Sequence, residues 1–126
     1  MKKLLLLTFL FCGISSFAQN NAPIAVNDTI TLSYDQLNRG NSGDTNAYPI
    51  FIADIIANDF DPNGNPIFIS DIQFTASNSL STFQSNGNKV LSIEYKTIHG
   101  FFGLDTIKYT LRDDQFPILI DTGYIF

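Results

Sequence analysis

The residues best suited to chemistry lie in the stretch IIANDFDPNGNPI, at positions 55–67. Asp59, Asp61 and Asn63 alternate there, so their side-chain oxygens could turn toward one centre, as in the first half of a calcium loop. The second half does not match, because Ser70 stands where such a loop has a bidentate glutamate. This mismatch excludes a complete EF-hand and leaves open a weaker site built from oxygen ligands.

Two distant aspartates could complete such a site if the fold brings them near this loop. Asp28 precedes the loop by about thirty positions, and Asp113 lies close to the other end of the chain. Oxygen ligands of this kind suit calcium, which accepts six to eight of them. The predicted calcium ligands are therefore Asp28, Asp59, Asp61, Asn63 and Asp113.

The same stretch also has the composition of a tight turn. In Asp61-Pro62-Asn63-Gly64, aspartate stands first, proline second, and asparagine and glycine follow, which is an order that β-turns favour. Aspartate and asparagine side chains in such turns accept hydrogen bonds from nearby backbone amides. The sequence leaves a structural turn and a calcium site open as alternatives.

Catalytic chemistry has little support in the sequence. A general acid needs a carboxyl group whose pKa is raised by an apolar pocket, whereas Asp59 and Asp61 lie in a polar stretch. His99 is the single histidine, and no cysteine follows Cys12 to join it in a zinc site. The chain also has no Gly-x-Ser-x-Gly motif. We therefore predict a protein without enzymatic activity and without catalytic residues.

Residues 1–18 have the pattern of a signal peptide. Two lysines precede the apolar run Leu4–Phe11, which is too short to cross a bilayer. Small residues at Ser16 and Ala18 fit the positions that a signal peptidase recognises. We expect cleavage before Gln19, no membrane insertion, and a secreted or cell-surface location.

The remaining residues, 19–126, have the length of one domain. Removing residues 1–18 takes away two lysines and no acid, which changes the net charge from −5 to −7. The few scattered basic residues exclude the positive patch that nucleic-acid binding requires. Because no cysteine remains, burial of apolar side chains must hold the domain together without disulfides.

Short alternating segments, separated by Asn, Asp, Gly and Pro, predict an all-β protein. In residues 104–112, Ile107, Tyr109 and Leu111 share one face of the expected strand. The other expected strands are residues 23–27, 29–33, 49–56, 67–74 with a bulge at Ser70-Asp71, 91–96 and 118–126. About seven strands are typical of an immunoglobulin-like Greek-key sandwich.

The spacing around Tyr109 is that of a tyrosine corner, with Leu111 where an antibody domain has its second cysteine. This motif predicts a hydrogen bond from the Tyr109 hydroxyl to upstream backbone. An ordinary tyrosine on a half-buried strand is the alternative. Residues 35–48 form a polar segment with two glycines, which we expect to be an exposed loop.

Three stretches in this order resemble the bacterial immunoglobulin-like, cadherin-like tandem domains of secreted and cell-surface proteins: NAPIAVNDTITL at 21–32, DIIANDFDPNGNPIFISDI at 54–72 and GFFGLDTIKYTLRDDQ at 100–115. The resemblance implies a seven-stranded sandwich used as a repeated spacer or adhesion module, with calcium held by aspartate-rich loops in some members. Asn27, Asn63 and Asn65 replace aspartates of the family pattern, which removes negative charge from the proposed calcium site.

We therefore expect a non-enzymatic, secreted or cell-surface module that acts as a spacer or adhesion domain and that calcium could rigidify. The expected partners are neighbouring domains of a longer chain, of which residues 19–126 would be an N-terminal part, and a cell-surface protein or glycan. The alternative is an accessory carbohydrate-binding module of a larger secreted hydrolase. In that case Tyr34, Tyr48 or Phe60 would stack on sugar rings.

Overall fold

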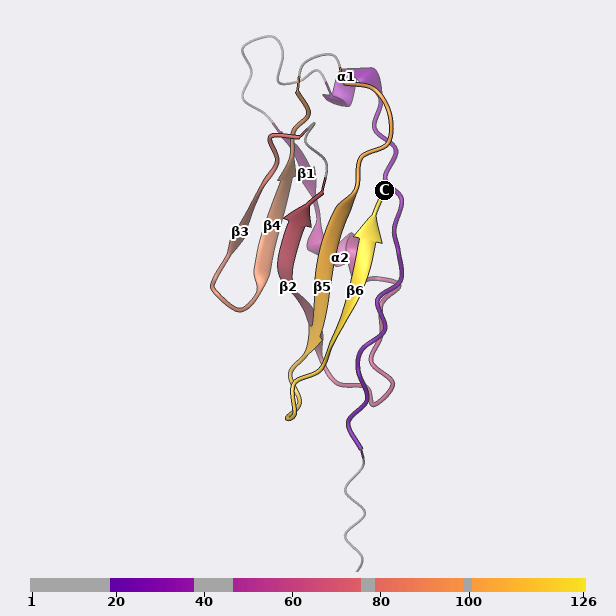
Figure 1. Ribbon diagram of the computed structural model, residues 1–126, viewed down its shortest axis with the longest axis vertical. Coiled ribbons are helices and arrows are strands. Elements are labelled where there is room, and N and C mark those ends of the chain that lie inside the picture. The colour runs from indigo at the N-terminus through magenta and orange to yellow at the C-terminus, as the bar shows by residue number, and fades with distance from the viewer. Residues whose placement is uncertain (1–18, 38–46, 76–78, 99–100) are drawn as a thin grey trace, which may run out of the picture.

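Two three-stranded antiparallel sheets form the protein (Figure 1). The computed structural model describes residues 19–37, 47–75, 79–98 and 101–126, so the expected signal peptide lies outside the described residues. The strands are β1 (Tyr48–Ile50), β2 (Ile67–Phe74), β3 (Thr82–Ser85), β4 (Val90–Tyr95), β5 (Ile107–Asp113) and β6 (Ile120–Ile125). Two single-turn helices are α1 (Tyr34–Leu37) and α2 (Ile52–Ile55). No helix in the described ranges is long and apolar enough to cross a membrane.

The strand order is that of a Greek-key sandwich. One sheet has the order β1-β4-β3 and the other has the order β2-β5-β6, so the chain crosses between the sheets three times. Buried residues of both sheets and of α2 form one core: Ile50, Ile55, Ile69, Ile72, Val90, Ile93, Tyr95, Ile107, Tyr109, Leu111 and Ile125. The predicted all-β, immunoglobulin-like sandwich is confirmed.

The N-terminal segment spans residues 19–30, and residues 23–30 within it act as a seventh strand. Ile24 exchanges two backbone hydrogen bonds with Phe60, of 2.7 and 3.2 Å. Further along, the Asp28 amide donates to the Tyr124 carbonyl at 2.9 Å and the Ile30 amide donates to the Phe126 carbonyl at 2.8 Å. The segment therefore runs parallel to β6, beside which it lies in Figure 1.

Several strands agree closely with the sequence. Strand β2 has the predicted bounds, and its register with β5 shifts between Ile69 and Asp71, which confirms the predicted bulge. In β5, Ile107, Tyr109 and Leu111 are at most 4% exposed, as the alternation predicted. The alternation in residues 29–33 also appears in their burial, although these residues form no regular strand and are joined to Phe126, which follows β6, through the amide of Ile30.

One predicted strand was wrong, and one strand was missed. Residues 49–56 were expected to form one strand, but β1 ends at Ile50 and α2 follows. The helical turn brings Ile52, Ile55 and Ile56 to one side, because residues three and four apart share a helix face, and Ile55 is 1% exposed. Strand β3 was not predicted. All four of its residues are exposed, so the strand lacks the alternation of buried and exposed residues by which a half-buried strand is recognised.

Candidate functional site

The predicted calcium ligands lie in two groups along the N-terminal segment. Asp28 and Asp59 form the first group, where the segment passes β6. Asp61, Asn63 and Asp113 form the second group, at the end of the sandwich where residue 19 lies. The fold thus gathers all five residues near one segment, but not around one centre.

Asp59 is the centre of the first group. The bridge between Ile24 and Phe60 makes the chain locally extended, so Asp59 and Asp61 turn inward while Phe60 is 51% exposed. Asp59 is only 8% exposed, and its Oδ1 accepts hydrogen bonds from the Val26 amide at 2.7 Å and the Tyr109 hydroxyl at 3.0 Å. The carboxylate therefore fastens the N-terminal segment to the middle of β5.

The Tyr109 hydroxyl hydrogen-bonds upstream backbone, as the tyrosine-corner spacing predicted, although the acceptor is far away in the sequence. Its hydroxyl lies 3.1 Å from the Val26 carbonyl, 83 positions upstream, and hydrogen-bonds Asp59 as well. The ring reaches them by crossing Gly123, its partner on β6, where an added Cβ atom would overlap the ring. An aromatic ring over a cross-strand glycine fills the space that a side chain would otherwise occupy.

The first group is a concentration of negative charge. Burial, followed by the charge of Asp59, raises the pKa of the Asp28 carboxyl above its usual value. Burial also raises the pKa of Asp59, opposed by the hydrogen bonds from Val26 and Tyr109 and reinforced by the charge of Asp121. Asp121, which the sequence analysis did not single out, accepts a hydrogen bond from the Ala25 amide at 2.9 Å.

The second group contains the predicted turn. Oδ1 of Asp61 accepts hydrogen bonds from the amides of Asn63 at 2.7 Å and Asn65 at 3.2 Å. The Gly64 amide donates to the Asp61 carbonyl at 3.0 Å, and Gly64 has a φ of +76°, which glycine adopts without strain. The structural interpretation of this stretch is confirmed.

Asn20 joins this turn to the end of β5. Its side-chain amide donates to Oδ2 of the fully buried Asp113 at 2.7 Å, and its carbonyl oxygen accepts from the Asn65 amide group at 2.9 Å. Oδ1 of Asp113 accepts from the Leu119 amide at 2.9 Å. Nothing local in the sequence distinguishes Asn20 from its neighbour Asn21, so its place in this group was not predicted.

Two carboxylate oxygens in this region are buried without a hydrogen-bond partner, Oδ2 of Asp28 and Oδ2 of Asp61. Each is chemically suited to a hard cation such as calcium. Within the described ranges, however, no group of three or more His, Cys, Asp or Glu side chains comes together to hold a metal. Asparagine and backbone oxygens would have to complete any coordination shell, and calcium binding stays a prediction.

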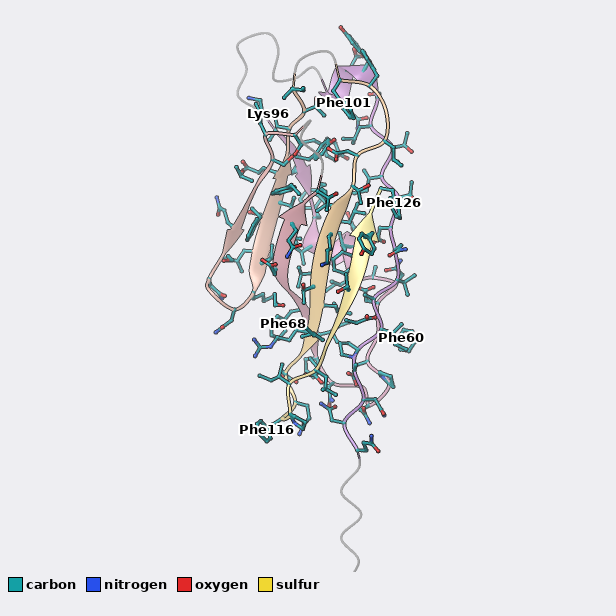
Figure 2. All side chains as sticks on the ribbon, in the orientation of Figure 1. Phe60, Phe68, Lys96, Phe101, Phe116 and Phe126 are labelled. Carbon is teal, nitrogen blue, oxygen red and sulfur yellow. The ribbon has the colours of Figure 1, made fainter. Side chains whose placement is uncertain are left out.

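The aromatic residues expected to stack on sugars are dispersed. Tyr34 is 61% exposed and stacks on Phe102, with ring centroids 5.7 Å apart. Phe60 projects from the lower half of the molecule in Figure 2, whereas α1, which carries Tyr34, lies at the top. Tyr48 is half-buried in β1. These three residues therefore do not form one stacking platform.

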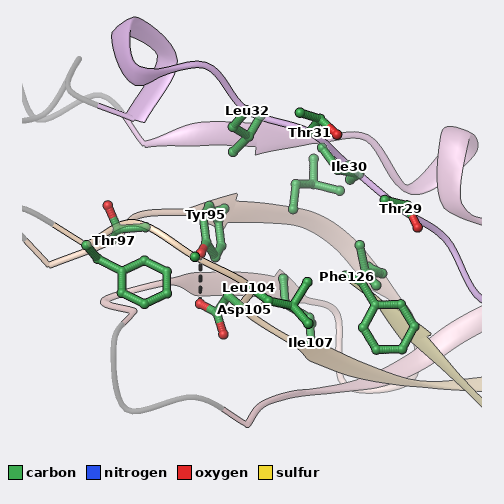
Figure 3. Close-up of a pocket in the computed structure, with 14 residues that line it drawn as sticks. Thr29, Ile30, Thr31, Leu32, Tyr95, Thr97, Leu104, Asp105, Ile107 and Phe126 are labelled. Carbon is green, nitrogen blue, oxygen red and sulfur yellow. Dashed lines mark hydrogen bonds between the residues drawn. The ribbon is translucent and has the colours of Figure 1, made fainter.

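A cavity of about 310 Å³ opens at the end of the sandwich near α1 (Figure 3). Residues 29–32 form one wall, and Leu104, Asp105 and Ile107 lie across from them in Figure 3. Inside it, the Tyr95 hydroxyl donates to Oδ2 of Asp105 at 2.8 Å. Burial, and then this hydrogen bond, raise the pKa of Tyr95, so the phenol remains protonated.

Comparison with known proteins assigns this architecture to a family. The sequence pattern of the family described as a bacterial Ig domain matches residues 20–116, which include both aspartate groups. A search of curated proteins found no significant match. A search of solved structures also found none.

Proposed function

The chain belongs to the bacterial Ig domain family, and from this premise we propose that it is a non-enzymatic spacer or adhesion module of an exported protein. The main support for the proposal is the hydrogen bonding of three buried carboxylates. Asp59, Asp61 and Asp113 each accept at least two hydrogen bonds from the chain itself. Asp59 and Asp113 hold the N-terminal segment through Val26 and Asn20. Asp61 closes its own turn, so all three carboxylates serve the fold itself instead of facing a cleft where a substrate could react.

The path of the chain suits a module placed in series. Residue 19 lies at one end of the sandwich, and β6 runs toward the other end (Figure 1). Neighbouring domains attached before and after such a unit would extend in opposite directions. An acidic surface would keep these units soluble outside the cell.

Immunolabelling of intact cells tests the exported location. We expect antibodies against the domain to label unpermeabilised cells or to detect the protein in the medium. A deletion strain should then attach less to its surface or to other cells. Labelling that appears only after permeabilisation, with unchanged attachment of the deletion strain, would refute the proposal.

We further propose that calcium rigidifies the N-terminal segment through Oδ2 of Asp61, with neighbouring amide and carbonyl oxygens. The melting temperature should rise in millimolar calcium and return to its starting value with EDTA, because a ligand that binds only the folded state stabilises it. Asp61→Asn should reduce this response, and Asp54→Asn, on the exposed side of α2, should leave it unchanged. Equal melting temperatures of the wild-type protein in calcium and EDTA would remove calcium from the proposal.

A further inference from the structure

We propose that the free edge of β3 pairs with the β3 strand of a second copy of this chain. In this arrangement the two strands run antiparallel about a two-fold axis and join two β1-β4-β3 sheets into one. The inference goes beyond a spacer function, because it assigns a self-association surface to one strand. Strand β3 lies at the outer edge of the sandwich in Figure 1.

The other sheet edges are protected against pairing. The N-terminal segment covers β6. The edge formed by β2 contains Asp71 and the bulge beside it, and both features oppose the addition of a strand. The edge formed by β1 is three residues long and contains Pro49, which has no amide proton. Among the described residues, β3 alone offers an edge without a charge or a proline, and its register shift comes only at its last residue, Ser85.

Electrostatics favours this edge for contact between identical chains. The protein is acidic, so two copies repel each other across most of their surfaces. Residues 72–88 contain no charged side chain and form the longest such stretch between residues 19 and 126. Strand β3 lies within this stretch. A second copy can therefore approach here with the least repulsion.

The backbone of β3 is arranged to accept a partner strand. The Leu80 amide donates to the Lys96 carbonyl at 2.7 Å, in line with the register that places Phe83 opposite Ile93. Hydrogen-bonded and non-hydrogen-bonded pairs alternate in an antiparallel ladder, so the amide and carbonyl of Phe83 face the free edge. With Phe83 on the two-fold axis, the two copies exchange two hydrogen bonds through this residue.

The side chains of this arrangement are self-complementary. Thr82 of one copy lies opposite Gln84 of the second copy, and both are polar, uncharged and exposed. Phe83 is 37% exposed, and Leu80, three residues before it, is 62% exposed. Association would remove part of this apolar surface from water. Because the same patch serves both copies, the assembly closes as a dimer.

Sedimentation of the purified protein over a concentration series tests the proposal with two matched variants. In Thr82→Lys/Gln84→Lys, each new lysine meets a lysine of the second copy, and we expect dimerisation to weaken about tenfold or more. In Thr82→Lys/Gln84→Glu, each lysine instead meets a glutamate, and dimerisation should persist. A wild-type protein that stays monomeric up to about millimolar concentration, or equal dimerisation of the two variants, would overturn the proposal.

Amide hydrogen exchange locates the contact independently. Exchange of the Phe83 amide should slow as the protein concentration rises, while the outward amides of β2 should be unaffected. At concentrations low enough for all three proteins to be monomeric, circular dichroism and melting curves of both variants should match those of the wild-type protein, since the substituted side chains are exposed. Protection of β2 instead of β3, or capture of a different protein by β3 without any self-association, would contradict pairing between copies.

Discussion

Replacing Tyr109 by phenylalanine should destabilise the domain strongly, although it removes a single oxygen atom. A hydroxyl has one proton, which the Tyr109 group shares between Asp59 and the Val26 carbonyl. A hydrogen bond to a charged group contributes about 1.5–3 kcal/mol to the free energy of unfolding. The loss also leaves Oδ2 of Asp59 without its donor among the described residues, since the hydroxyl lies 3.2 Å from that atom.

Together these effects predict a loss of about 2–4 kcal/mol from a total stability of about 5–15 kcal/mol. For a domain of this size, the melting temperature should fall by roughly 10–25 °C. Urea unfolding at neutral pH measures the free energy directly. Amide exchange should show faster opening at Val26, because its amide donates to the same carboxylate.

Tyr124→Phe is the matched control, since it makes the same chemical change on a ring that is 36% exposed. We expect its stability to stay within about 0.5 kcal/mol of the wild-type value. If Tyr109→Phe also falls within about 0.5 kcal/mol, the hydroxyl does not hold the N-terminal segment and the reasoning is refuted.

Two further predictions concern the same region. The pKa values of Asp28 and Asp59 are raised on folding, so the folded state binds more protons than the unfolded state above pH 3.8. The stability that these two carboxyls contribute is therefore present below pH 3.8 and is lost as the pH rises through their folded pKa values. The urea midpoint should accordingly fall as the pH rises over this range. Asp59→Asn, which keeps an acceptor oxygen, should make the urea midpoint depend less on pH. Gly123→Ala should cost about 1–3 kcal/mol by crowding Tyr109, and thermal unfolding should show recovery when Tyr109→Leu is added; no recovery would exclude that collision as the cause.

Local features of the sequence predicted the parts of the fold that are decided locally. The alternation around Tyr109 identified the buried face of β5, because one side of a half-buried strand is apolar at every second residue. The change of parity at Ser70-Asp71 predicted the bulge in β2 for the same reason. The turn at Asp61 was predictable because its amide donors are two and four residues away.

The remaining features depend on contacts between distant residues. Asp59 accepts hydrogen bonds from Val26 and Tyr109, which are 33 and 50 positions away in the sequence, and no local pattern specifies those partners. A run of apolar residues such as 49–56 fits a buried strand or a helical turn equally well, and packing against β4 decides between them. Strand β3 is exposed on both faces, so only its pairing with β4 defines it.

The parallel pairing of the N-terminal segment with β6 has a mechanical consequence. The backbone of Asp28 and Ile30 is hydrogen-bonded to that of Tyr124 and Phe126, and the N-terminal segment and β6 run in the same direction. A pull that drags the start of the N-terminal segment away from the end of β6 would load these bonds in shear, all at the same time. Bonds loaded together resist a pull better than bonds that open one after another. Stretched between neighbours in a series, this sandwich would yield only after that whole set of bonds had broken.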